Sequence, residues 1–167
     1  LITQSLQEGT KPSQILAVSC TEDPSVALID FCKRERVKRI QVASTSELRR
    51  YLSRLGRRKK VVVETGDLAP SERASDPIFD LFTDRLLDIE LMLVIPATNQ
   101  SEFLRVVNRH IQGLPIAGAI ISRTSEAVSL GAVLDTLILS EIPLMGITRR
   151  VDKVIQPIKA SGLINIA

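Results

Sequence analysis

Short apolar runs alternate with longer amphipathic runs along the whole chain. The apolar runs are rich in valine and isoleucine and are bounded by turn residues, a pattern that favours β-strands. They cover residues 15–19, 39–43, 61–64, 91–95, 116–122 and 144–147. Between them, apolar residues recur at the spacing of one helix face. These predicted helices cover residues 24–35, 46–55, 76–87, 101–111 and 129–140.

This alternation predicts a three-layer α/β fold, in which helices cover both faces of a mostly parallel sheet. The chain has 167 residues, about the length of one domain, and we find no internal repeat in it. Aromatic residues make up only 3% of it, so leucine, isoleucine and valine must fill the core. Such a core is typical of parallel sheets between helices. We therefore expect residues 1–167 to form a single domain.

Local signals indicate how some helices begin and how deeply they are buried. Pro24 suits the first turn of the helix over residues 24–35. Ser46 is the candidate cap of the next helix, because a serine side chain can accept a hydrogen bond from the first turn. The helix over residues 129–140 is apolar along most of its length, so we expect it to be well buried.

The cysteines and the apolar runs bear on the compartment. Two cysteines, Cys20 and Cys32, do not make a disulfide framework, and reduced thiols of a cytosolic protein are the better interpretation. The longest apolar run, residues 91–97, is far shorter than the roughly 20 residues of a membrane-spanning helix. No signal-peptide pattern is present. We expect a cytoplasmic protein.

Positive charge is concentrated in one segment. Residues 33–60 contain 12 lysines and arginines and two acidic residues, an excess of +10, whereas the remainder holds 10 basic and 17 acidic residues. Segregated charge of this kind suits an anionic partner. The favoured interpretation is a solvated helix face with a charged turn at residues 57–60. The alternative is peripheral contact with the inner face of an anionic membrane, rather than with nucleic acid. The candidate residues are Arg49, Arg50, Arg57, Arg58, Lys59 and Lys60.

Ligands of open α/β sheets bind beyond the carboxyl ends of the strands, so the residues there are the candidate site. The longest polar segment, residues 66–75, follows such an end. Several segments near strand ends resemble the signal-recognition-particle GTPases. They are residues 93–104 (LVIPATNQSEFL), similar to a strand, "ATT" turn and helix; 129–132 (SLGA), which open a helix; 61–66 (VVVETG), similar to the "LIDTAG" strand; and 142–144 (IPL), similar to "GLPL". The resemblance covers nearly the whole chain and most resembles the flagellar-biosynthesis branch.

The resemblance implies a P-loop NTPase-like fold of the signal-recognition-particle GTPase type, with GTP and Mg²⁺ as ligands if nucleotide binding is retained. It matches residues 1–8 to the helix that follows the phosphate-binding loop. A GxxxxGK[ST] loop, which supplies most of the phosphate contacts in the family, would lie just upstream of Leu1 and is absent from this sequence, so we expect the domain to lack its N-terminal strand and phosphate loop.

The residues that would carry the chemistry depart from the family pattern. The positions that match its nucleotide motifs are Glu64, Thr65, Gly66, Asp67, Arg123 and Ser125. Where the family has Asp-Thr-Ala-Gly, Glu64 keeps a carboxylate that could reach a metal-bound water, and Asp67 adds a negative charge near the γ-phosphate. Where the family has Thr-Lys-Leu-Asp, Ser125 cannot reproduce the two hydrogen bonds of the aspartate to guanine.

A third departure follows the first strand. Where the family carries Asp-Thr-Tyr-Arg, residues 21–24 are Thr-Glu-Asp-Pro, without the carboxylate and the arginine that serve magnesium and transition-state charge. No cysteine–histidine cluster has metal-ligand spacing, and we assign no catalytic or metal-ligating residue.

These departures favour a GTPase-like domain with little or no GTPase activity. We expect it to act through protein contacts in protein targeting or in polar or membrane assembly, such as that of a flagellum. The expected partner is a protein, either a second copy or the other member of a signal-recognition-particle-type heterodimer. One alternative is an active GTP-binding member of the family whose phosphate loop lies upstream. Another is a distant α/β protein that shares only the architecture.

Overall fold

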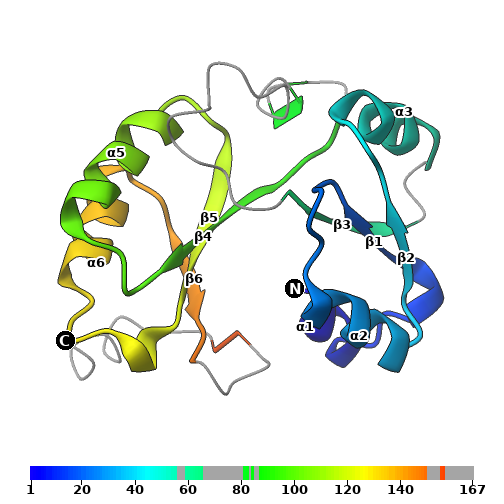
Figure 1. Cartoon of the computed structure of the whole chain (residues 1–167), viewed down its shortest axis with the longest axis horizontal. Coiled ribbons are helices and arrows are strands. Elements are labelled where there is room, and N and C mark those ends of the chain that lie inside the picture. Colours follow the sequence, from blue (N-terminus) through cyan, green and yellow to red (C-terminus); the bar gives the residue numbers. More distant parts are fainter. Residues whose placement is uncertain (56–58, 66–80, 83, 85–86, 150–154, 157–167) are drawn as a thin grey trace. The chain divides into compact units, whose positions relative to one another are not determined.

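The computed structural model describes residues 1–55, 59–65, 81–82, 84, 87–149 and 155–156. The chain divides into two compact units, Leu1–Leu87 (unit 1) and Asp88–Ala167 (unit 2), and each is described by itself. Figure 1 shows the elements. Unit 1 contains α1 (Ile2–Gln7), β1 (Ile15–Ser19), α2 (Val26–Arg34), β2 (Lys38–Gln41), α3 (Thr45–Leu55) and β3 (Lys60–Glu64). Unit 2 contains β4 (Leu91–Pro96), α5 (Ser101–Ile111), β5 (Ile116–Ser122), α6 (Gly131–Leu139) and β6 (Leu144–Ile147).

The described strands form two three-stranded sheets, in the order β2-β1-β3 in unit 1 and β4-β5-β6 in unit 2. All of these strands pair in parallel, which confirms the predicted parallel α/β architecture. That residues 1–167 act as one domain stays a prediction. The predicted helix over residues 76–87 and the loop over 66–75 fall largely or wholly outside the described residues.

Most predicted boundaries agree with the structure. The strands at 15–19, 116–122 and 144–147 and the helix at 101–111 have the predicted bounds. The strand predicted at 39–43 instead runs from Lys38 to Gln41. It ends there because β1 ends at Ser19, whose carbonyl oxygen accepts a last hydrogen bond from Val42 N.

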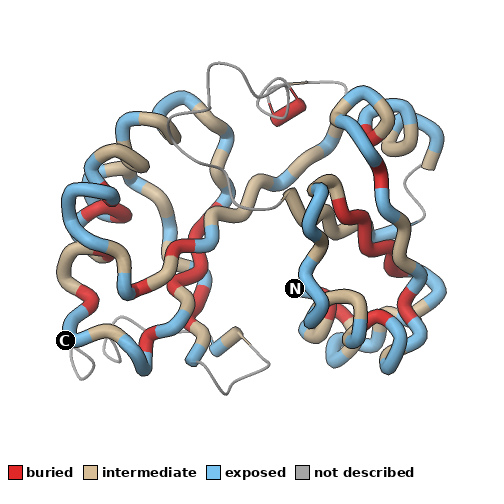
Figure 2. Tube along the Cα trace, in the orientation of Figure 1, coloured by how far each residue is buried: buried red, intermediate tan, exposed pale blue. Residues whose placement is uncertain are grey.

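Strand β1 forms the centre of unit 1 and is buried along its whole length (Figure 2). Ile15 and Ala17 lie on one face of the sheet, because side chains alternate along a strand. There they belong to one buried cluster with Ile2 of α1 and Cys32 of α2. Figure 1 shows α3 on the opposite side of this sheet from α1 and α2, so helices cover both faces of unit 1.

In unit 2, helices α5 and α6 lie side by side and pack on the sheet. Leu104 of α5 and Val133 of α6 are buried with Ile95, Ala119 and Ile121 of the strands. The core is therefore aliphatic, as the low aromatic content predicts.

The structure corrects the predicted helix starts. Helix α3 is capped by Ser44, whose Oγ accepts a hydrogen bond from Glu47 N at 3.2 Å, and not by Ser46. The Glu47 carboxylate in turn accepts from Ala43 N at 2.9 Å, so the two side chains satisfy backbone donors reciprocally. Helix α2 begins after Pro24, because Ser25 is its N-cap and accepts from Leu28 N.

The predicted burial of the last helix is only partly correct. Val133 and Leu137 of α6 are buried, but Ile138 and Leu139 are 72% and 75% exposed. A helix that packs on a sheet buries one stripe, and these two residues lie outside that stripe. No helix within the described ranges is long and apolar enough to cross a bilayer.

Helix α2 ends in a Schellman motif with an arginine at its left-handed position. Arg36 has φ +56°, a region that usually holds glycine. Arg36 N donates to Lys33 O, and Val37 N donates to Cys32 O at 2.9 Å. Val37 and Cys32 are both buried in the core of unit 1, so the motif directs the chain from α2 into β2.

We expect the Arg36→Gly variant to be more stable than the wild type by about 0.5–1 kcal/mol. Glycine relieves the left-handed strain of about 1–2 kcal/mol, less the entropy that glycine adds to the unfolded chain. Urea unfolding measures the difference. Arg54→Gly is the matched control: Arg54 lies in the last turn of α3, and glycine inside a helix should cost about 1 kcal/mol. Destabilisation by Arg36→Gly would contradict this account of the motif.

Candidate functional site

The carboxyl ends of β1 and β3 meet at one edge of unit 1, where Ser19 lies opposite Glu64. Glu64 Oε2 accepts a hydrogen bond from Ser19 Oγ at 3.0 Å. Glu64 Oε1 accepts from Ser25 N at 3.2 Å, at the N-cap of α2. The carboxylate of Glu64 therefore ties together two strands and the start of a helix.

An arginine completes this network from the third strand. Arg39 of β2 donates from its guanidinium to Ser19 Oγ at 3.1 Å, so a fully buried serine links Arg39 to Glu64. Both charges also act on the nearby thiol of Cys32. Burial raises the pKa of Cys32 above its usual value, Arg39 opposes this rise, and Glu64 adds to it. Cys32 and Cys20 are not joined in a disulfide, in agreement with the predicted reduced thiols.

The network determines what Glu64 can do. Both of its carboxylate oxygens already accept a hydrogen bond from the protein, and the positive charge of Arg39 lies one serine away. Within the described part of the chain, no group of three or more histidine, cysteine, aspartate or glutamate side chains could hold a metal ion. Glu64 is therefore engaged by the fold at this edge.

The loop after β1 adds negative charge to this edge. Glu22 and Asp23 are exposed, and they lie between the end of β1 and Ser25, which binds Glu64. The backbone is held by Gln41 Nε2, which donates to Thr21 O at 3.3 Å. The described edge thus carries three carboxylates and one arginine, which disfavours a phosphate anion.

In unit 2, the segment after β5 is a tight turn that satisfies its own charged groups. Arg123 has φ +58° and donates from Nε and Nη2 to Glu126 Oε2, at 3.1 and 2.5 Å. Thr124 is buried, and its N and Oγ1 both donate to Thr148 O, which ties the turn to the end of β6. Ser125 is exposed.

The predicted site residues therefore fall in three places. Glu64 ends β3 and Thr65 follows it in unit 1, Arg123 and Ser125 follow β5 in unit 2, and Gly66 and Asp67 lie outside the described residues. Their role towards a nucleotide stays a prediction. Sequence reasoning missed Ser19, Ser25 and Arg39. Two signals were available: Ser19 ends an apolar run, and Ser25 directly precedes a helix. Nothing in the pattern singled out Arg39.

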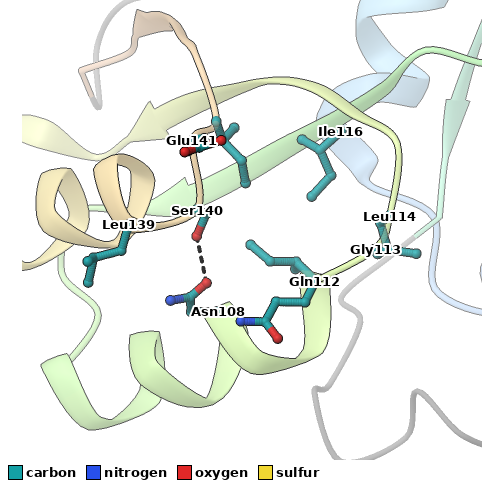
Figure 3. A pocket seen from close by; sticks show the side chains of 10 residues that line it. Asn108, Gln112, Gly113, Leu114, Ile116, Leu139, Ser140 and Glu141 are labelled. Atoms are coloured by element: carbon teal, nitrogen blue, oxygen red, sulfur yellow. Dashed lines mark hydrogen bonds between the residues drawn. The ribbon is translucent and has the colours of Figure 1, made fainter.

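Two cavities in unit 2 lie away from Arg123 and Ser125 of the same unit. One, of about 290 Å³, is lined by the turns that lead into β5 and β6, where Ser140 Oγ donates to Asn108 Oδ1 at 2.6 Å (Figure 3). The other, of about 410 Å³, is lined by α6 and the start of β6. The first of these cavities is lined by Ile116, the first residue of β5. At about 3.3 Å per residue, the length of this strand places Ile116 about 20 Å from Arg123. The cavities are thus at the opposite end of the strands of unit 2 from Arg123 and Ser125.

Solved structures share this fold. FlhF complexed with GTP and Mg²⁺ matches with a TM-score of 0.76 and 19% identity, over 98% of this chain and 64% of that chain. FlhF complexed with GMPPNP and Mg²⁺ gives 0.70 and 18%, over 98% and 65%. Chloroplast FtsY from Physcomitrella patens gives 0.69 and 16%, over 98% and 57%. The chain thus spans less than two thirds of each of these chains.

Sequence comparison adds no further likeness: no protein-family model and no curated protein matches the chain. The resemblance to the signal-recognition-particle GTPases is confirmed at the level of the fold, which is that of FlhF and FtsY.

Proposed function

We propose that this chain is a signal-recognition-particle GTPase-like domain whose nucleotide chemistry has been largely lost and which acts through protein contacts. The observation that carries the proposal is the engagement of Glu64. This residue stands where the family has the aspartate of its Asp-Thr-Ala-Gly motif, and both its oxygens accept hydrogen bonds from Ser19 and Ser25. The carboxylate joins elements of the fold instead of facing a ligand.

The charge of the same edge supports this proposal. Thr21 and Pro24 stand where the family has the aspartate and the arginine that serve magnesium and the transition state, and Glu22 and Asp23 between them add two exposed negative charges to the loop after β1. These carboxylates would repel the triphosphate of a nucleotide. Arg39 is the one described cation of the network, and its guanidinium already donates a hydrogen bond to Ser19.

The turn after β5 supports the loss of guanine recognition. Ser125 stands where the family aspartate would accept two hydrogen bonds from guanine, and a hydroxyl lacks the paired acceptor oxygens of a carboxylate. Arg123 stands where the family has lysine, and its guanidinium is directed to Glu126.

The biological role follows by analogy and is part of the proposal. The fold of FlhF and FtsY supports a cytoplasmic protein that takes part in protein targeting or in assembly at the cell pole or membrane, including flagellar assembly. Its partner would be a protein, either a second copy or a related GTPase in a heterodimer.

The competing proposal is an active GTP-binding protein with a phosphate loop upstream of Leu1. It is favoured by the two FlhF structures, which contain GTP or GMPPNP with Mg²⁺. Those ligands belong to chains that share under 20% identity with this one. The strand-end residues described above also differ from the family motifs at the positions that would bind magnesium and guanine.

Sedimentation of the protein distinguishes these proposals. We expect the same sedimentation coefficient in Mg²⁺ buffer with and without GTP or a non-hydrolysable analogue, because no nucleotide completes the contact surface. A mixture with an intact signal-recognition-particle-type GTPase should show association that does not depend on a nucleotide bound to this chain. Dimerisation of this protein only upon addition of GTP would contradict the proposal.

A further inference from the structure

The strands of unit 1 all begin at one edge of the sheet, opposite to the edge that holds Glu64, and basic residues gather there. Lys38 begins β2 and Lys60 begins β3, and these strands flank β1 on its two sides (Figure 1). In the register of the sheet, Lys38 lies beside Leu16 and Lys60 beside Ile15. The two lysine backbones are therefore separated by two strand spacings, about 10 Å.

The connections into the three strands add more positive charge at this edge. Lys33 and Arg36 lie at the end of α2, just before β2, and Lys59 directly precedes β3. Lys11 lies shortly before β1. We call the exposed set Lys11, Lys33, Arg36, Lys38, Lys59 and Lys60 the basic edge.

The charge of the basic edge is not neutralised by neighbouring described residues. None of its six side chains forms an ion pair or a hydrogen bond with another described residue. Two acidic residues lie near the same helix ends, and both are engaged. Glu8 accepts a hydrogen bond from Gln4, and Glu35 pairs with Arg34 at 2.9 Å.

Three other arginines within residues 33–60 have structural partners. Arg39 binds Ser19, and Arg49 pairs with Asp84, whose side chain is only 7% exposed. Arg34 also lies 5.3 Å from the ring centre of Phe31. Arg34, Arg39 and Arg49 therefore have partners within the fold, whereas the mainly lysine basic edge has none among the described residues. Of the predicted surface, Lys59 and Lys60 belong to the basic edge, Arg50 is exposed on α3, and Arg57 and Arg58 lie outside the described residues.

Local stability does not account for the basic edge. A cation in the last turn of a helix complements the helix dipole, which explains Lys33. Arg36, Lys38, Lys59 and Lys60 lie beyond the helices. Arg36 occupies a left-handed position where glycine would be more stable, so a charged side chain is kept there at a cost to the fold.

We propose that the basic edge of unit 1 is a docking surface for an anionic lipid bilayer. Five of its six residues are lysines, which act as point charges and suit a diffuse layer of lipid phosphates, whereas bidentate recognition of individual phosphates favours arginine. The set runs along a sheet edge over three strands and contains no aromatic side chain on which a nucleic-acid base could stack. The basic edge does not include the Glu64 edge. The lipid-docking proposal can therefore be supported or overturned independently of the proposed loss of nucleotide binding.

Vesicle co-sedimentation tests the proposal. The protein should bind vesicles of phosphatidylcholine with phosphatidylglycerol, and not phosphatidylcholine alone. It should dissociate as ionic strength rises from about 0.01 M to about 1 M, where the screening length falls from about 30 Å to about 3 Å. Each cation near an anionic surface contributes about a fivefold change in partitioning. The double variant Lys38→Gln with Lys59→Gln should therefore bind about 25-fold more weakly.

Two control variants distinguish the effect of the basic edge on lipid binding from the effects of net charge and of fold stability. Arg105→Gln with Arg109→Gln removes the same charge from exposed positions on α5 of unit 2, and binding should stay within about twofold. Arg36→Gly should bind about fivefold more weakly although the fold is more stable. Equal weakening by the α5 pair, or no binding to anionic vesicles at low ionic strength, would overturn the proposal. Tighter binding to a structured RNA than to vesicles at the same ionic strength would overturn it in favour of a nucleic-acid surface.

Discussion

Replacement of Glu64 by alanine is expected to lower the free energy of unfolding by about 3 kcal/mol, because it removes a charged acceptor of two hydrogen bonds. Ser25 N would lose its partner at the start of α2, and the buried Ser19 Oγ would lose its acceptor. Arg39 would keep its bond to Ser19 without the nearby negative charge. Urea-induced unfolding measures the loss.

Control variants make this result specific to the network. Glu22→Ala removes an exposed carboxylate from the same edge and should change stability by no more than about 0.5 kcal/mol. Glu64→Asp keeps the charge but shortens the side chain by one methylene, so it should lose one of the two hydrogen bonds. We expect its free energy of unfolding to fall by about half as much as that of Glu64→Ala. The Glu64→Ala and Ser19→Ala variants should show a coupling energy of about 1 kcal/mol or more. A Glu64→Ala variant as stable as Glu22→Ala would contradict the structural role of Glu64.

The secondary structure could be predicted well because its signals are local. Strands β1, β5 and β6 stand out as apolar runs of β-branched residues, and the face of α5 follows from the spacing of its apolar residues. Parallel pairing followed from the alternation of strands and helices. The boundaries of α2 and α3 were less certain, because Ser25 and Ser44 compete with Pro24 and Ser46 as starting positions and only the backbone geometry decides between them.

The candidate site was predictable in position but not in its contacts. Glu64 and Arg123 could be located at strand ends from their motifs. Their hydrogen bonds to Ser25 and Glu126 depend on turn geometry, which the spacing of residues does not determine. The sequence also could not show which basic residues within 33–60 have partners in the fold. Arg49 and Lys60 look alike in sequence, and only the fold brings Asp84 to Arg49.

The largest functional effect that we expect is a nucleotide affinity far below that of a working GTPase. Three described changes act in the same direction. The carboxylate of Glu64 is engaged by the fold, Glu22 and Asp23 make the edge more negative, and Ser125 stands where the resemblance to the family would place the guanine-binding aspartate. Each change alone is worth a few kcal/mol at most. Together they are comparable with the difference of about 4 kcal/mol between micromolar and millimolar binding.

Isothermal titration calorimetry of the full-length protein with GTP, GDP and ATP in Mg²⁺ buffer tests the central claim most directly. The account predicts no saturable binding for any of the three nucleotides, with dissociation constants weaker than about 1 mM. Binding of GTP with a dissociation constant of about 1 μM and a preference over ATP would contradict it.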